Sequence, residues 1–123
     1  MSADHNDAAD RREFPPFVRA LPEADIPVDG LRGWMLQSRD GQVLFLEAQG
    51  EVLLPLHSHG DQWGFVVEGA MELNIGGRTV TFSRGDSYFI PEGTLHGGKL
   101  HPGFRVVDYF ADPERYKPRG NSP

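Results

Sequence analysis

Short apolar segments alternate with turn-forming residues along most of the chain. None of these segments is long enough, with a 3.6-residue period, to form an amphipathic helix. Turn signals such as Asp40-Gly41 and Arg84-Gly85-Asp86 separate them, and 15 glycines and 10 prolines punctuate the chain. Many short strands at near-regular spacing are typical of an antiparallel barrel or sandwich, so the pattern predicts an all-β fold. The expected strands cover residues 31–36, 43–47, 52–56, 63–67, 71–75, 79–82, 87–90 and 104–110.

The clearest hairpin is centred on Gly76-Gly77. These two glycines lie between the apolar segments 72–75 and 78–82. A two-residue primed turn needs a positive φ at both central positions, which glycine adopts without steric penalty. The sequence therefore predicts two antiparallel strands joined at this point.

The chain is expected to form one domain. Its 123 residues, 38% of them hydrophobic, suffice for one compact core and leave too little chain for a second. The opening from Met1 to Glu13 is polar and has no apolar period that could attach it to a core. We therefore predict a flexible tail over residues 1–16, a barrel over 17–116 and a second flexible tail over 117–123.

Composition restricts the possible partners. With 12 basic and 18 acidic residues the net charge is −6, and no basic stripe interrupts this balance. This argues against nucleic acid and favours a small-molecule partner. The chain has no cysteine, which excludes disulfides, thiolate metal sites and cysteine nucleophiles. No apolar run approaches the roughly 20 residues of a membrane-spanning helix, and the first residues are not signal-like, so we expect a cytoplasmic protein without membrane contact.

Candidate metal ligands occur first around His57 and His59. Side chains of an extended strand alternate with a period of two, so these imidazoles are expected on one face of a strand. A short turn at Gly60-Asp61 then leads into the strand that begins near Gln62. If the two strands are neighbours, the Gln62 amide lies beside both imidazoles, and three ligands converge.

A second group of candidate residues runs from Gly85 to His96. Glycine opens a turn, an aromatic strand follows, and Pro91 and Gly93 bend the chain before His96. This segment matches the pattern G-x5-P-x-G-x2-H, and together with residues 50–69 it resembles the two sequence motifs of the cupin family. Only the Asn that follows the second motif in the family is replaced, by Leu100. The resemblance implies an antiparallel double-stranded β-helix, or jelly-roll, barrel.

The resemblance also implies one divalent transition metal ion inside the barrel, bound by His57, His59, Gln62 and His96. Gln62 lies seven positions before Gly69, where the family has a Glu ligand. Three neutral imidazoles and a neutral amide leave the charge of the metal uncompensated, so the site should attract an anionic substrate. The ligand set is compatible with Zn, Ni, Mn, Fe or Cu and disfavours an iron oxygenase built on two histidines and a carboxylate.

Asp61 is the alternative fourth ligand. Its carboxylate is intrinsically the better ligand, but its count from Gly69 does not match the motif. We therefore expect it to cap the turn or to support a ligand from behind.

The last expected strand is similar to the closing segment of small cupins that act in pectin and alginate breakdown, which convert unsaturated uronates to linear ketonized sugars. In those proteins an Asp-x-Phe pair lines the site and an Arg binds the substrate carboxylate. The resemblance gives these roles to Asp108, Phe110 and Arg115, although Arg115 is one position further along than expected. The residues themselves indicate that Asp108 has apolar neighbours on its face and must bond something. An Asp108 that faces solvent, or pairs with Arg105 or Arg115, remains the alternative.

We therefore expect a metal-dependent lyase or isomerase that acts on a small anionic sugar acid. In this hypothesis the metal polarises a carbonyl or hydroxyl, Asp108 or Tyr109 moves a proton, and Arg115 orients the carboxylate. The alternatives are a non-catalytic sugar-binding or sensing protein and a metal-dependent dioxygenase. The strand around Trp63 and Phe65 is apolar on both faces, which indicates either ordinary core or, as we expect, a homodimer interface.

Overall fold

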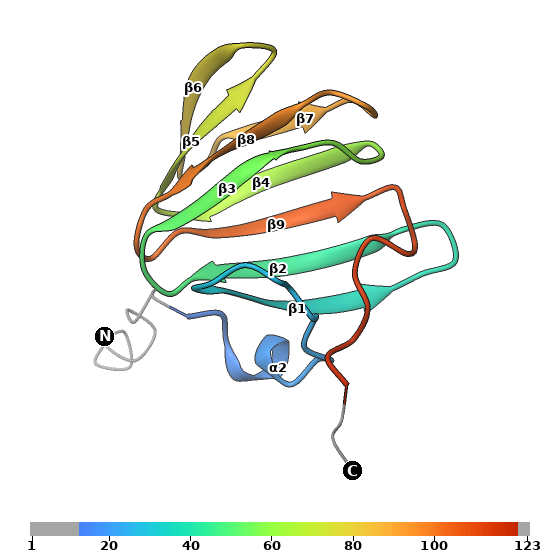
Figure 1. Ribbon diagram of the computed structural model, residues 1–123. Helices are drawn as coiled ribbons and strands as arrows, with labels where there is room; N and C mark the ends of the chain where they lie inside the picture. Colours follow the sequence, from blue (N-terminus) through green and yellow to red (C-terminus); the bar gives the residue numbers. More distant parts are fainter. Residues whose placement is uncertain (1–12, 121–123) are drawn as a thin grey trace, which may run out of the picture.

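The computed structural model describes residues 13–120, which form two antiparallel sheets and one short helix (Figure 1). The five-stranded sheet has the order β1-β2-β9-β4-β7, and the four-stranded sheet has the order β3-β8-β5-β6. The elements are α2 (Pro16–Arg19), β1 (Leu31–Gln37), β2 (Gln42–Ala48), β3 (Val52–His57), β4 (Gln62–Glu68), β5 (Ala70–Ile75), β6 (Arg78–Ser83), β7 (Ser87–Ile90), β8 (His96–Leu100) and β9 (Arg105–Phe110).

The hydrophobic core lies between the two sheets. In β4 the burial alternates, with Val66 fully buried and Phe65 exposed. Leu73 of β5 and Val106 of β9 come from opposite sheets and belong to the same core cluster. This alternation allows each sheet to bury one face against the other, as in an aligned sheet packing. The expected jelly-roll barrel is confirmed.

The predicted hairpin at Gly76-Gly77 is also confirmed. It joins β5 to β6, with Ile75 paired with Arg78. Both glycines have positive φ, 57° and 78°, as a two-residue primed turn requires.

Strand β8 is the element that the sequence did not predict. Its residues read His-Gly-Gly-Lys-Leu, with no β-branched or aromatic side chain to indicate a strand. The glycines are required by its place between β3 and β5. A Cβ atom at Gly98 would overlap the backbone of Glu72, and one at Gly97 would meet the carbonyl of Leu54. Close approach of the neighbouring backbones, rather than local preference, forms this strand.

The predicted division into tail, barrel and tail stays a prediction; residues 1–12 and 121–123 lie outside the described residues. Phe14 is buried, its backbone N–H donates to the Glu47 carboxylate at 2.6 Å, and its ring packs edge-on against Phe45. At the other end, the Lys117 carbonyl accepts a hydrogen bond from the N–H of Asp25 at 2.8 Å. These contacts join Phe14 and Lys117 to neighbouring parts of the described chain.

The segment after β9 crosses one end of the barrel. Its path is fixed by Gln42, whose side-chain amide donates to the Tyr116 carbonyl at 2.6 Å and accepts from the Tyr116 N–H at 3.0 Å. Gln42 itself is 1% exposed. These two hydrogen bonds place Arg115 and Tyr116 at the barrel interior.

The outer surface of the five-stranded sheet carries an aromatic patch, which we call the outer aromatic face. It consists of Trp63, Phe65, Phe89 and Tyr109, all at least 38% exposed. Trp63 pairs with Phe89 on one side and with Tyr109 on the other, so the rings are neighbours. Within residues 13–120, no helix is long and apolar enough to cross a membrane.

Candidate metal centre and cavity

Three histidines meet at one end of the barrel. His57 ends β3 and lies directly opposite His96, which begins β8, while His59 follows in the loop after β3. The ring centroids are 4.3 Å apart for His57 and His96, 4.7 Å for His59 and His96, and 5.2 Å for His57 and His59. One ligand atom from each ring lies within 4.8 Å of the others. The three rings can therefore share a single ion.

Backbone carbonyls determine which ring nitrogen is free. Each Nδ1 lies 2.8 Å from a carbonyl oxygen, that of Pro55 for His57, of Gly60 for His59 and of Thr94 for His96. A carbonyl can only accept, so each Nδ1 carries the proton and each Nε2 keeps its lone pair. Such a carbonyl partner is the usual support behind a metal-binding histidine.

The surroundings of His59 and His96 favour the neutral imidazole. Burial is the main cause that lowers the pKa of His59 to about 4, and the nearby Arg115 charge contributes in the same direction. Burial is also the main cause that lowers the pKa of His96, with smaller effects from His57 and Arg115. Neutral imidazole is the form that binds metal, so near pH 7 the donors suit a divalent transition metal.

His101, the other histidine among the described residues, is not part of this cluster. His101 lies on the surface, where its Nε2 is 3.0 Å from the Glu72 carboxylate. His5 is outside the described residues. The ligand set that the structure brings together among His, Asp and Glu is therefore His57, His59 and His96.

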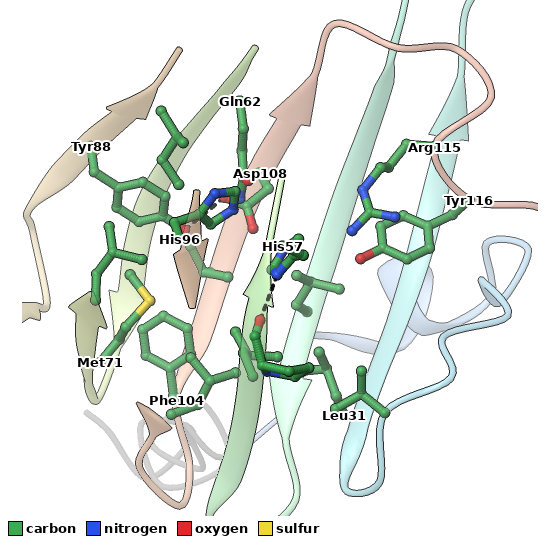
Figure 2. Close-up of a pocket in the computed structure, with 18 of the residues that line it drawn as sticks. Leu31, His57, Gln62, Met71, Tyr88, His96, Phe104, Asp108, Arg115 and Tyr116 are labelled. Atoms are coloured by element: carbon green, nitrogen blue, oxygen red, sulfur yellow. Dashed lines mark hydrogen bonds between the residues drawn. The ribbon is translucent and has the colours of Figure 1, made fainter. Parts of the chain in front are cut away.

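A cavity of about 260 Å³ extends from the histidines into the barrel (Figure 2). Its polar lining groups gather at one end, and the other lining residues are all apolar. The polar lining residues are His57, Gln62, Tyr88, His96, Asp108, Arg115 and Tyr116.

Asp108 is the buried acid of the cavity. It is 2% exposed, and the Tyr88 hydroxyl donates to its Oδ1 at 2.7 Å. Burial raises the pKa of Asp108 to about 6, although hydrogen bonds from Tyr88 and Gln62 act in the opposite direction. The interpretations of Asp108 as solvent-facing or paired with an arginine are both wrong, because Tyr88 is its partner. Its inward orientation agrees with the prediction.

Tyr88 was not predicted as a site residue, although the alternation along its strand indicates that its side chain faces inward. Tyr88 and Ile90 alternate with exposed neighbours along β7, which places the Tyr88 ring inside the barrel. Burial, followed by the Asp108 charge and hydrogen bond, raises the pKa of Tyr88 well above its ordinary value, so its hydroxyl stays protonated. Gly64 lies between the two in the sheet, and a Cβ atom there would overlap both Asp108 and Tyr88.

Gln62 reaches the site by a different route from the one expected. Strands β3 and β4 are not neighbours; they belong to opposite sheets, so Gln62 faces the histidines across the barrel. Its side chain is largely buried and hydrogen-bonds the Asp108 carboxyl. Asp61, the alternative ligand, instead accepts from the Glu92 N–H at 2.7 Å and does not join the histidine cluster.

Arg115 enters the cavity without an acidic partner. Its guanidinium lies 4.5 Å from the Tyr116 ring centroid and 5.6 Å from that of Phe110. Its Nε is buried and has no hydrogen-bond partner. No ion pair between residues of the described chain, 13–120, involves it. A cation held in this way is suited to bind an anionic group.

Two predicted site residues do not line the cavity. Tyr109 alternates with Asp108 and points outward, so the structure does not support it as a proton carrier. Phe110 is buried and packs against the rings of His59 and Tyr116, at 5.5 and 5.6 Å. Its ring contacts these two side chains and does not line the cavity.

The fold and the site together define a jelly-roll barrel with an interior three-histidine centre. A family model described as "Cupin domain" matches residues 42–103, which span β2 to β8 and include all three histidines. The chain belongs to this family, and the resemblance found in the sequence is confirmed.

Solved structures of similar proteins agree. An RmlC-like cupin from Shewanella frigidimarina is 28% identical with a TM-score of 0.70, covering 84% of this chain and 93% of that one. KdgF from a Halomonas species is 26% identical with a TM-score of 0.64, covering 80% and 87%. The polyketide cyclase RemF from Streptomyces resistomycificus shares the fold at 20% identity, with a TM-score of 0.65 over 89% and 87%. A comparison with curated proteins found no match.

Proposed function

We propose that this protein is a metal-dependent lyase or isomerase that acts on a small anionic substrate resembling a sugar acid. One observation carries the proposal. A single cavity is lined by two of the three clustered imidazoles, by a buried acid whose pKa is raised to about 6, and by an arginine that has no acidic partner among residues 13–120. The similarity to KdgF and the inward-facing Asp108 of β9 also support it.

The metal would be held by the Nε2 atoms of His57, His59 and His96, with Gln62 as the fourth ligand. Gln62 would bind the cation through its side-chain carbonyl oxygen, because the amide nitrogen has no lone pair to offer. A divalent metal in this position supplies Lewis acidity toward a carbonyl or hydroxyl oxygen.

The chain's own side chains would bind the substrate and move its proton. Arg115 binds the carboxylate, helped by the positive charge of the centre. Asp108 takes up or delivers the proton, because a carboxyl with a pKa of about 6 exchanges protons readily near neutral pH. Tyr88 holds Asp108 in place through its 2.7 Å hydrogen bond.

The test is turnover of unsaturated uronates by metal-loaded protein, followed as loss of the ultraviolet absorbance of the conjugated double bond. We expect Arg115→Met to raise KM by about 10- to 100-fold, the range of a charged hydrogen bond. Arg39→Met, at a side chain that is 93% exposed, is the matched control and should leave KM unchanged. Equal KM values for the two variants would contradict the role of Arg115.

The same preparation separates the alternatives. A sugar-binding or sensing protein would bind the acids tightly and release no product. A dioxygenase would consume oxygen as substrate disappears. A lyase or isomerase would release product without consuming oxygen.

We also propose that the protein is a homodimer joined through the outer aromatic face. Four aromatic side chains are exposed together on this face, and single-sheet apolar patches of this kind mark association surfaces.

A further inference from the structure

The cavity has an apolar end that the metal chemistry does not use. This end lies beyond Asp108 and Tyr88 and is lined by hydrophobic side chains alone (Figure 2). We call it the apolar chamber, and its lining residues are Leu31, Leu46, Met71, Leu100, Phe104 and Val106.

Strand register separates the chamber from the polar end. Inward-facing residues of β9 run from Asp108 to Val106 in the direction away from the histidines. On β8, in the opposite sheet, they run from His96 past Gly98 to Leu100. Both sheets thus change from polar to apolar in the direction away from the histidines.

A fully hydroxylated sugar acid does not suit this chamber. Hydroxyls that entered it would lose their water and find no donor or acceptor on its walls, and each would weaken binding about tenfold or more. An apolar group would leave water on entry and gain contacts with the same walls.

We propose that the sugar-acid-like substrate is amphipathic, with its carboxylate and remaining hydroxyls at the polar end beside Arg115 and a hydroxyl-poor part in the apolar chamber. The inference rests on the proposed function for the anionic group and adds the chemistry of the rest of the molecule. At about 30 Å³ for a group of the size of water, the 260 Å³ cavity takes about nine such groups, enough for a carboxylate and about six carbons.

The test is a binding series on the full-length, zinc-loaded protein. Propanoate, pentanoate and heptanoate keep the carboxylate and lengthen the apolar body, and erythronate supplies a hydroxylated acid with the same number of non-hydrogen atoms as heptanoate. We expect the dissociation constant to fall about fourfold for each added methylene until the chamber is full. Erythronate should bind more weakly than heptanoate.

Methionine methyl NMR locates the bound acid. The chain has three methionines; Met71 lines the chamber, Met35 is buried elsewhere, and Met1 is at the start of the chain. We expect heptanoate to shift the Met71 methyl signal, assigned with Met71→Leu, and to leave the Met35 signal in place.

A variant that fills the chamber completes the test. Val106→Phe should remove the gain from the longer chains and leave propanoate binding unchanged, with Leu100→Met as a milder second variant. No binding of any acid, affinity independent of chain length, or an unmoved Met71 signal would overturn the inference. Binding is measured without turnover, so conversion of uronates without a chain-length effect refutes only this inference. A chain-length effect without any turnover refutes only the proposed reaction.

Discussion

Replacing Asp108 with Asn should stabilise the metal-free protein at neutral pH while it abolishes turnover. The carboxyl is 2% exposed, and burial raises its pKa from 3.8 to about 6. Asn has nearly the same shape and can still accept the Tyr88 hydrogen bond, but it carries no charge to bury. The substitution therefore separates the proton-transfer role of Asp108 from its cost to folding.

The pH dependence follows from the direction of the shift. The unfolded chain ionises this group near pH 3.8, whereas the folded protein holds the proton up to about pH 6. Stability from this group is therefore complete below pH 3.8, falls between pH 3.8 and 6, and stays reduced above pH 6. A shift of about two pH units at about 1.4 kcal/mol per unit gives up to about 3 kcal/mol.

The assay is urea denaturation of chelator-treated protein from pH 4 to pH 8. Asp108→Asn should match the unmodified protein at pH 4 and exceed its free energy of unfolding by about 1 to 3 kcal/mol at pH 7. Asp40→Asn, at a side chain that is 80% exposed, should show no pH-dependent gain. A variant that is less stable at pH 7, or a difference constant with pH, would refute the reasoning. The zinc-loaded variant should keep its metal and lose turnover.

Three further predictions concern packing, association and the metal. Gly64→Ala should destabilise the protein by about 1 to 3 kcal/mol in thermal unfolding, because its Cβ overlaps the Asp108–Tyr88 pair, whereas Gly50→Ala, with open space around it, should not. Trp63→Glu should convert the proposed dimer to a monomer in light scattering. Leu53→Glu, 65% exposed on the other sheet, is its control, and an unchanged mass for Trp63→Glu would contradict the interface. His59→Ala should lower the metal content measured by elemental analysis. A full complement of metal in this variant would argue against the shared site.

Much of the fold could be predicted from the alternation of apolar and polar residues with a period of two and from the turn-forming residues. The glycine pair between β5 and β6 could be recognised because the backbone conformation it needs is local. The spacing of His57, His59 and His96 within a family pattern indicated the metal centre before any strand was paired. These features depend on residues near one another in the chain, or on a motif that already contains the long-range information.

Two of the errors came from contacts between distant residues, and the third, on Tyr109, came from a local pattern that was not applied. Strand β8 could not be recognised from its residues, because its glycines are required by the close approach of the two flanking backbones. Tyr109 was given a role that alternation itself excludes once Asp108 faces inward. Tyr88 was overlooked because nothing near it in the chain indicates that it meets an acid 20 residues away.

The sequence by itself determined that the chain forms short strands joined by glycine turns, and that His57, His59 and His96 form one cluster that could hold a metal ion. Only the tertiary structure decided that Gln62 faces those histidines from the opposite sheet, and that Arg115 is brought into the cavity by a segment crossing the barrel end. The physical reason is that strand preference resides in a residue and its neighbours. Which strands face each other depends on burying the apolar faces of the whole chain at once.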